Sequence, residues 1–182
     1  MNKKLLLGLG KQLGLTRDRS HPGLALRGQL DGAPVFVAQY EMPMGRDPSP
    51  RPFTELRVER ASAWRGDLSG TSPGCRGDTG NGPFDDRFVW SPHLDLPEYG
   101  LRPATPPADA KLTSRPHYLG SPRLLQSLLA LDASIAATMG HQGIVVFKID
   151  HLETMTRMMI LTHLPQPTLL EWALRLLIEL GT

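Results

Sequence analysis

The feature that most constrains the fold is a pair of β-forming runs separated by a two-residue turn signal. Residues 24–30 read LALRGQL and residues 33–40 read APVFVAQY, with Asp31-Gly32 between them. An Asp-Gly dipeptide readily takes the positive φ angles of a tight hairpin turn, which joins neighbouring antiparallel strands. The sequence therefore predicts a hairpin over residues 23–42 and favours antiparallel pairing in the sheet that contains it.

Glycine and proline are frequent enough to limit regular structure elsewhere. The 182 residues include 18 Gly and 17 Pro, whereas ordinary globular proteins have about 12 per cent of the two together. Residues 42–52, MPMGRDPSPRP, hold four prolines and are predicted to form a loop. Residues 61–83 show no hydrophobic period and are predicted to be irregular. Residues 91–122 contain seven prolines, so we expect a Pro-rich connection that offers extended surface to a partner.

Three further segments carry strand signals. Residues 53–59, FTELRVE, alternate a mainly charged face with an apolar face, which indicates a half-buried strand. Residues 143–149, GIVVFKI, are mostly apolar and predict a central strand. Residues 156–164, TRMMILTHL, predict its neighbour, with a turn over residues 150–155.

Apolar residues at helical spacing predict three helices. Residues 1–15 carry leucines on one helical face. A second helix is expected to begin after its N-cap, Ser121, and to end near Gly140. The third closes the chain and is predicted to open at Thr168-x-x-Glu171, which has the spacing of a capping box.

The order of these elements predicts an α+β fold. Strands joined mainly by turns favour an antiparallel sheet built from hairpins, with C-terminal helices packed on one face and long Pro/Gly-rich loops. We expect a single domain over residues 1–182. Within it, residues 1–15 form the N-terminal helix, 16–90 the N-terminal strands, 91–122 the Pro-rich connection and 123–182 a helix-strand-strand-helix unit.

Charge and cysteine content narrow the partners and the compartment. The net charge is +2, but residues 1–27 hold six basic side chains against one acidic side chain, and the remainder is slightly acidic. This distribution gives no strong nucleic-acid signal. Lys3, Lys4 and Lys11 could make a weak contact with an anionic membrane surface, although the apolar run between them is shorter than a signal-peptide core. Cys75 is the only cysteine, which rules out an internal disulfide and a Cys-rich zinc site and fits a reducing compartment. We expect a cytoplasmic protein, at most peripheral to a membrane, without cofactors.

The candidate chemistry is incomplete at every motif. Asp78-Thr79-Gly80 matches the tripeptide of aspartic proteases, but those enzymes need two such carboxylates, and the chain has one copy. A small-ligand or metal-dependent enzyme would instead use Asp and His side chains near residues 78–93. Its candidate residues are Asp78, Asp85, Asp86, His93 and His141.

Histidines give no metal-binding spacing. None of the six lies four residues from another on a predicted helix, and no HExxH motif occurs. We expect each histidine at the surface or in a turn. The sequence leaves open whether four of them converge in space, namely His93, His141, His151 and His163.

The stretch from Gly77 to Phe88, GDTGNGPFDDRF, is predicted to be a structural corner. Gly80 is one of the glycines that permit the turn, and Asp85 is placed to cap the loop amides. Phe84 and Phe88 are expected to anchor the corner in the core. We expect the strand to begin at Arg87, with Phe84 tucked under the turn.

The sequence of this corner resembles a motif of a known group of proteins. Residues 79–90, TGNGPFDDRFVW, resemble the G-[DN]-x-x-F-D-x-x-F-x-V motif of an uncharacterised group of bacterial proteins, many of them membrane-anchored. Upstream, LALRGQLDGAPVFV is similar to their hairpin and FTELRV to their next strand. Trp90 departs from the usual Val or Leu, and this chain shows no membrane span. The resemblance, which covers most of residues 13–180, implies an architecture and brings no assigned activity.

The leading functional hypothesis is a non-catalytic protein-protein interaction or structural subunit of a bacterial assembly, working with a protein partner or as a homo-oligomer. Its basis is that the sequence holds no coherent set of nucleophile, base and oxyanion donors. The enzyme described above is the alternative.

Overall fold

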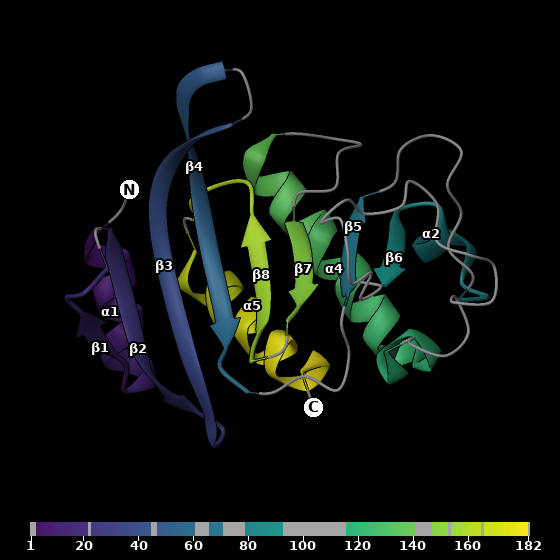
Figure 1. The fold of residues 1–182 in the computed structure, drawn as a ribbon, viewed down its shortest axis with the longest axis horizontal. Coiled ribbons are helices and arrows are strands. Elements are labelled where there is room, and N and C mark those ends of the chain that lie inside the picture. Colours follow the sequence, from purple (N-terminus) through teal and green to yellow (C-terminus); the bar gives the residue numbers. More distant parts are fainter. Residues whose placement is uncertain are drawn as a thin grey trace, which may run out of the picture.

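A computed structural model describes most of the chain. The described residues are 3–21, 23–44, 47–60, 66–70, 79–92, 116–140, 147–152, 154–164 and 166–181. They form an α+β structure, as the sequence predicts, in which one antiparallel sheet is covered by helices on one face (Figure 1).

The sheet has eight strands in the order β1-β2-β3-β4-β8-β7-β5-β6, and every neighbouring pair is antiparallel. The C-terminal hairpin β7–β8 therefore lies between the N-terminal strands and the β5–β6 pair. The strands are β1 (Thr16–Asp18), β2 (Leu24–Leu30), β3 (Ala33–Met44), β4 (Asp47–Val58), β5 (Gly66–Gly70), β6 (Phe88–Pro92), β7 (Phe147–His151) and β8 (Thr156–Ile160).

Helices lie behind the sheet in Figure 1 and enclose the main core against it. Helix α1 packs on β2 and on α5, whereas α5 packs on β4 and β8. The buried leucines of α4 and α5 supply much of this core, which confirms that the C-terminal helices cover one face. The helical segments are α1 (Lys3–Leu13), α2 (Gly82–Asp85), a 3₁₀ turn (His117–Gly120), α4 (Pro122–Met139) and α5 (Pro167–Leu180).

The predicted hairpin is confirmed in detail. Leu24 pairs with Gln39 and Leu30 with Ala33, so the turn contains only Asp31 and Gly32. Both turn residues have positive φ, 52° and 75°, as a type I′ hairpin turn requires.

The boundaries of α4 follow its sequence. Pro122 lies in the first turn and Gly140 ends the helix in the left-handed region at φ 67°, where glycine is preferred. Ser121 occupies the N-cap position as predicted, but its side chain makes no capping hydrogen bond.

The capping box predicted for α5 is wrong. The helix begins at Pro167 with Gln166 as its N-cap. Proline's fixed φ suits the first helical position. Thr168 is therefore already inside the helix and cannot serve as its N-cap. Glu171 instead accepts hydrogen bonds from Arg175 at 2.9 Å and from Gln12 at 3.2 Å, and so ties α5 to α1.

The loop predicted over residues 42–52 is also wrong. β3 continues to Met44 and β4 begins at Asp47, so most of this Pro-rich stretch forms the outer part of a long hairpin. A register irregularity falls between Pro43 and Met44. Pro43, Pro50 and Pro52 fit because they occupy positions whose backbone nitrogens point out of the hairpin, where no hydrogen bond to the partner strand is needed.

The prediction that residues 61–83 are irregular is wrong for the described part of this range. Gly66–Gly70 forms β5, with Leu68 buried and strands paired on both sides. Neighbouring strands supply its hydrogen bonds, so one apolar residue is enough to hold it. At the other end, the strand predicted to reach Leu164 stops at Ile160.

The N-terminal helix is confirmed, and its apolar face is part of the core. Leu6 and Leu9 are 0 and 1 % exposed, whereas Lys3, Lys4 and Lys11 are exposed. None of the helices among the described residues is long and apolar enough to cross a membrane. A membrane-surface contact through the lysines stays a prediction.

Candidate functional site

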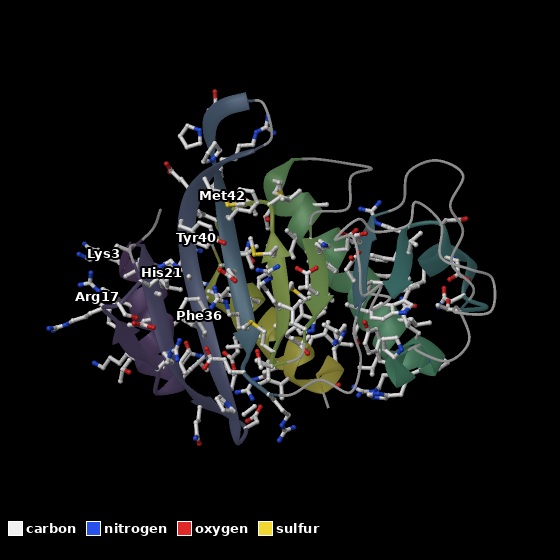
Figure 2. All side chains as sticks on the ribbon, viewed as in Figure 1. Lys3, Arg17, His21, Phe36, Tyr40 and Met42 are labelled. Carbon is white, nitrogen blue, oxygen red and sulfur yellow. The ribbon has the colours of Figure 1, made fainter. Side chains whose placement is uncertain are left out.

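The sheet face opposite the helices, here called the open face, carries the candidate site. No described helix lies over it, and it faces the viewer in Figure 1. Figure 2 shows Phe36, Tyr40 and Met42 following one another along β3 on this face, with His21 beside them. Alternation along the strands sends their neighbours Val35, Val37 and Gln39 to the helical side.

Six charged side chains of alternating sign cross the open face from β4 to β5 and form what we call the charge ladder. Each carboxylate contacts at least one cation. Arg57 Nε lies 2.7 Å from Glu55, Arg157 Nη2 lies 2.7 Å from Asp150, and Lys148 Nζ lies 2.8 Å from Asp150. Longer contacts join Arg157 to Glu55 at 4.0 Å and Lys148 to Asp67 at 3.6 Å. In order, the ladder is Arg57, Glu55, Arg157, Asp150, Lys148 and Asp67.

The cations hold at least one of these carboxylates ionised. Burial alone would raise the pKa of Asp150, but the hydrogen bonds from Lys148 and Arg157 outweigh it and lower the pKa. The hydrogen bond to Glu55 raises the pKa of Arg57, which keeps that guanidinium charged. Opposite charges within contact distance therefore stabilise each other across strands.

Tyr40 lies between the charge ladder and the apolar part of the face. Its hydroxyl donates to Glu55 Oε2 at 3.1 Å. Burial, the charge of Glu55 and this hydrogen bond raise the pKa of Tyr40 to about 12. The phenol stays protonated at neutral pH and acts as a hydrogen-bond donor there.

A small second core stabilises the open face on β2 and β3. Phe36 packs with Ala25 and Ala38 and is 1 % exposed. The guanidinium of Arg57 lies 4.5 Å from the Phe36 ring centroid and that of Arg27 lies 5.6 Å from it. Cations over a ring face are attracted to its electrons. The two arginines therefore cover the Phe36 ring in addition to pairing with carboxylates.

A cavity of about 790 Å³ opens beside the middle of the ladder. Its polar side is formed by Lys148, Asp150 and Arg157, and its apolar side includes Met42 and Leu161. These two residues are 36 and 38 % exposed. Other apolar residues in its lining are Tyr40, Phe53, Phe147 and Met159.

The arrangement is suited to binding. Asp150, with its lowered pKa, is a weak base, and Tyr40, with its raised pKa, is a weak acid. Proton transfer at neutral pH needs groups whose pKa lies near 7. The side chains of this face instead present hydrogen-bond donors beside an apolar hollow.

The predicted corner folds around Asp85. Its carboxylate accepts hydrogen bonds from Thr79 N at 3.0 Å and from Thr79 Oγ1 at 2.7 Å. Asn81 caps α2 through a 3.2 Å bond from Phe84 N, and Gly80 takes φ 76°. Asp85 thus serves the turn amides, as its sequence context suggests.

Phe84 and Phe88 lie in the core, 1 and 0 % exposed, with ring centroids 4.9 Å apart. Phe84 belongs to the short helix α2 and β6 begins at Phe88, one residue after the predicted start at Arg87. Arg87 pairs with the buried Asp132 of α4 and ties the corner to that helix.

The proposed enzyme site is only partly placed. Asp78, His93 and His141 lie outside the described residues. Asp85 accepts hydrogen bonds from Thr79, and Asp86 is part of the cavity lining. Among the described residues, no group of three or more His, Cys, Asp or Glu could hold a metal ion. The enzyme alternative stays a prediction.

The prediction that His151 lies at the surface or in a turn is wrong. It is 0 % exposed at the end of β7, with Nε2 3.0 Å from the Tyr118 hydroxyl and Nδ1 3.3 Å from Thr156 Oγ1. Burial strongly raises the pKa of Tyr118. His163 follows β8 and contacts the Tyr40 carbonyl at 3.0 Å. The two histidines lie at opposite ends of the β7–β8 hairpin and do not converge.

The charge ladder is not predicted from the sequence. The alternation in residues 53–59 indicates a half-buried strand with a mainly charged face, yet Glu55 on that face is 2 % exposed. Lys148, Asp150 and Arg157 were each part of a predicted strand or turn, without a role. The available signal was Lys148 and Asp150 two residues apart, which share one face of a strand.

Comparisons with models of protein families, with curated proteins and with solved structures gave no match to this chain. The resemblance of residues 79–90 to the bacterial group stays a prediction.

Proposed function

We propose that this chain is a non-catalytic protein-binding module, a subunit of a bacterial assembly, and that the open face is its docking surface. The observation that carries the proposal is the cavity on this face, where exposed apolar side chains lie beside the charge ladder. The proposed location is the cytoplasm.

Exposed apolar side chains support this surface. Among the described residues, three large hydrophobic side chains are at least 36 % exposed: Leu7, Met42 and Leu161. Two of the three lie at the cavity. Apolar side chains surrounded by polar groups are typical of interaction sites, and Met adapts its shape to a partner.

The rigidity of the face supports it as well. The charge ladder spans four neighbouring strands, so its side chains are positioned by the sheet backbone rather than by a loop. A partner that docks there meets side chains already ordered by ion pairs, which lowers the entropy loss on binding.

The proposal is tested by affinity capture from native lysate, with three forms of the full chain as bait. We expect the wild type to retain a partner protein and the double variant Met42→Glu, Leu161→Glu to lose it. Two carboxylates placed in the apolar side of the cavity oppose desolvation of that surface.

Leu7→Glu is the matched control. Leu7 is 37 % exposed on α1, away from the open face, so this variant should retain the same partner. Equal capture by the double variant and the wild type would contradict the proposal. Circular dichroism and thermal melting of all three forms establish that the loss is not a loss of folding.

A further inference from the structure

The charge ladder has equal numbers of cations and anions, but the two are not equally accessible. The side chains of Arg57, Arg157 and Lys148 are 26, 34 and 39 % exposed. Those of the three carboxylates, Glu55, Asp150 and Asp67, are 3, 4 and 5 % exposed. The long basic side chains extend over the short acidic ones, so a partner meets the cations.

Arg57 and Arg157 are directly opposite in the register of β4 and β8. Like charges at opposite positions of neighbouring strands repel each other. The buried carboxylate of Glu55 reduces the repulsion between the two arginines, at 2.7 Å from Arg57 and 4.0 Å from Arg157. An additional anion above the two guanidiniums would relieve it further.

Both arginines have donors beyond those used in the ladder. A guanidinium has five N–H donors. Arg57 directs Nε to Glu55, and Arg157 directs Nε and Nη2 to Asp150. Arginine's planar donors match the two oxygens of a carboxylate, which makes a carboxylate the suited ligand here.

An apolar site follows at a fixed distance along the strand. Met159 lies two residues after Arg157 on the same face and lines the cavity with Met42 and Leu161. Two residues of a strand span roughly 7 Å. The side chains of residues i and i+2 in an extended peptide have this same spacing.

The geometry points to a partner segment that is acidic and apolar at once. Resting on the proposed function, we infer that its Asp or Glu side chain binds above Arg57 and Arg157 while an apolar side chain about two residues away enters the cavity. The net charge of the ladder does not predict a preference for an acidic partner. The preference arises because the sheet buries the carboxylates and leaves the cations exposed.

The test uses a random-peptide phage library selected on the immobilised full chain. We expect enrichment of peptides that place Asp or Glu near Leu, Ile, Met or Phe. The affinity of the best synthetic peptide is then measured by fluorescence anisotropy. Its charge-swapped form, with Lys for each acidic residue, should bind at least about tenfold more weakly, equivalent to about 1.4 kcal/mol.

The protein variants locate the contact. The Arg157→Gln variant should bind the acidic peptide more weakly than the wild type does. Added NaCl should weaken the binding of this peptide to the wild type. Arg123→Gln is the matched control, since Arg123 is an exposed arginine paired with Glu179 on the helical side, and it should bind as the wild type does.

The outcomes separate the two proposals. Enrichment of neutral or basic peptides, equal binding of the charge-swapped peptide, or no enrichment would overturn this inference. If lysate capture still depended on Met42 and Leu161, the proposed function would stand with a partner of different chemistry. Two further results would overturn the inference. One is that the protein binds anionic vesicles but no acidic peptide, and the other is that it forms a dimer that Arg157→Gln dissociates.

Discussion

Gly80 illustrates a residue whose backbone angle decides its identity. Its φ is 76°, in the left-handed region, and a Cβ built there meets nothing within 4 Å. Any loss on substitution therefore comes from backbone strain alone. Gly82, two residues later, also has open space around it but lacks a positive φ.

This difference gives a matched pair of variants. Gly80→Ala should lower the free energy of unfolding by about 1–2 kcal/mol, the strain of an L-residue in the left-handed region. Gly82→Ala should cost less than Gly80→Ala, because the φ of Gly82 is not positive and only the following Pro83 restricts a residue with a Cβ there. Urea unfolding measures both, and equal losses would contradict the assignment.

Asp150 makes the charge ladder sensitive to acid. Its pKa is lowered in the folded state, so its contribution to stability is present above the ordinary carboxyl pKa and is lost as pH falls toward the folded value. We expect unfolding free energy to fall below about pH 5. Asp150→Asn should show a shallower fall over the same range.

Denaturant unfolding at a series of pH values checks this expectation. Glu179→Gln is the control, since Glu179 is 46 % exposed and paired on the surface; it should keep the wild-type slope. An unchanged slope in Asp150→Asn would show that other carboxylates carry the acid sensitivity.

At the scale of elements, the outer part of the β3–β4 hairpin, here called the arm, comprises residues 40–44 and 47–53. β2 pairs with β3 only as far as Gln39, and β8 pairs with β4 only from Thr54. The arm therefore extends beyond the neighbouring strands, as Figure 1 shows. Among the described strands neither edge of the arm has a neighbour, and strand edges of this kind invite association with other chains.

Proline blocks these edges. Glu59 N donates to Pro34 O at 2.8 Å, so odd-numbered residues of β4 point their amides to β3 and even-numbered residues point them away. Pro50 and Pro52 occupy outward positions, and Pro43 lies opposite Pro50. Their missing N–H groups remove the donors that another strand would need.

The arm prediction follows directly. Replacing Pro43, Pro50 and Pro52 together by Thr restores outward amides and should cause concentration-dependent self-association, detected by light scattering. Arg51→Thr is the control, because the Arg51 amide faces β3 and its substitution leaves both edges unchanged. A monomeric triple variant would show that proline is not what protects the arm.

At the scale of the whole molecule, Thr54 joins distant parts of the chain. Its buried Oγ1 donates to Thr162 O at 2.7 Å and accepts from Leu164 N at 3.2 Å. Gln39 Nε2 contacts both Thr54 Oγ1 and Leu164 O, at 3.4 and 3.3 Å. These bonds attach the segment between β8 and α5 to the N-terminal strands.

Thr54→Val keeps the shape and removes the hydroxyl, so it leaves the backbone amide and carbonyl unsatisfied. We expect the free energy of unfolding to fall by about 1–3 kcal/mol, measured by urea denaturation. Thr168→Val is the control, since Thr168 is exposed, and it should change stability by less than about 0.5 kcal/mol. Equal losses would mean that Thr54 contributes through shape only.

How much the sequence predicts depends on how local the cause is. Local signals predict correctly where the cause lies within a few residues. The structure confirms the turn at Asp31-Gly32, the helix end at Gly140 and the leucine stripes of the C-terminal helices. Glu171 and residues 42–52 were misjudged. For Glu171, the helix start at Pro167 removes the capping box, and Gln12 of the distant α1 is one of its partners. For the prolines, the deciding factor is the cross-strand pairing of β3 with β4.

The sequence by itself determined the α+β class, the antiparallel pairing and the apolar faces that became the core, because turn residues and hydrophobic periods act over short distances. Only the tertiary structure decided that β7–β8 lies between β4 and β5. That placement brings Arg57, Arg157, Asp150 and Lys148 together from three strands. The i, i+2 pairs Arg57/Glu55 and Lys148/Asp150 are visible in the sequence, but the contacts that join them through Arg157 form only across strands.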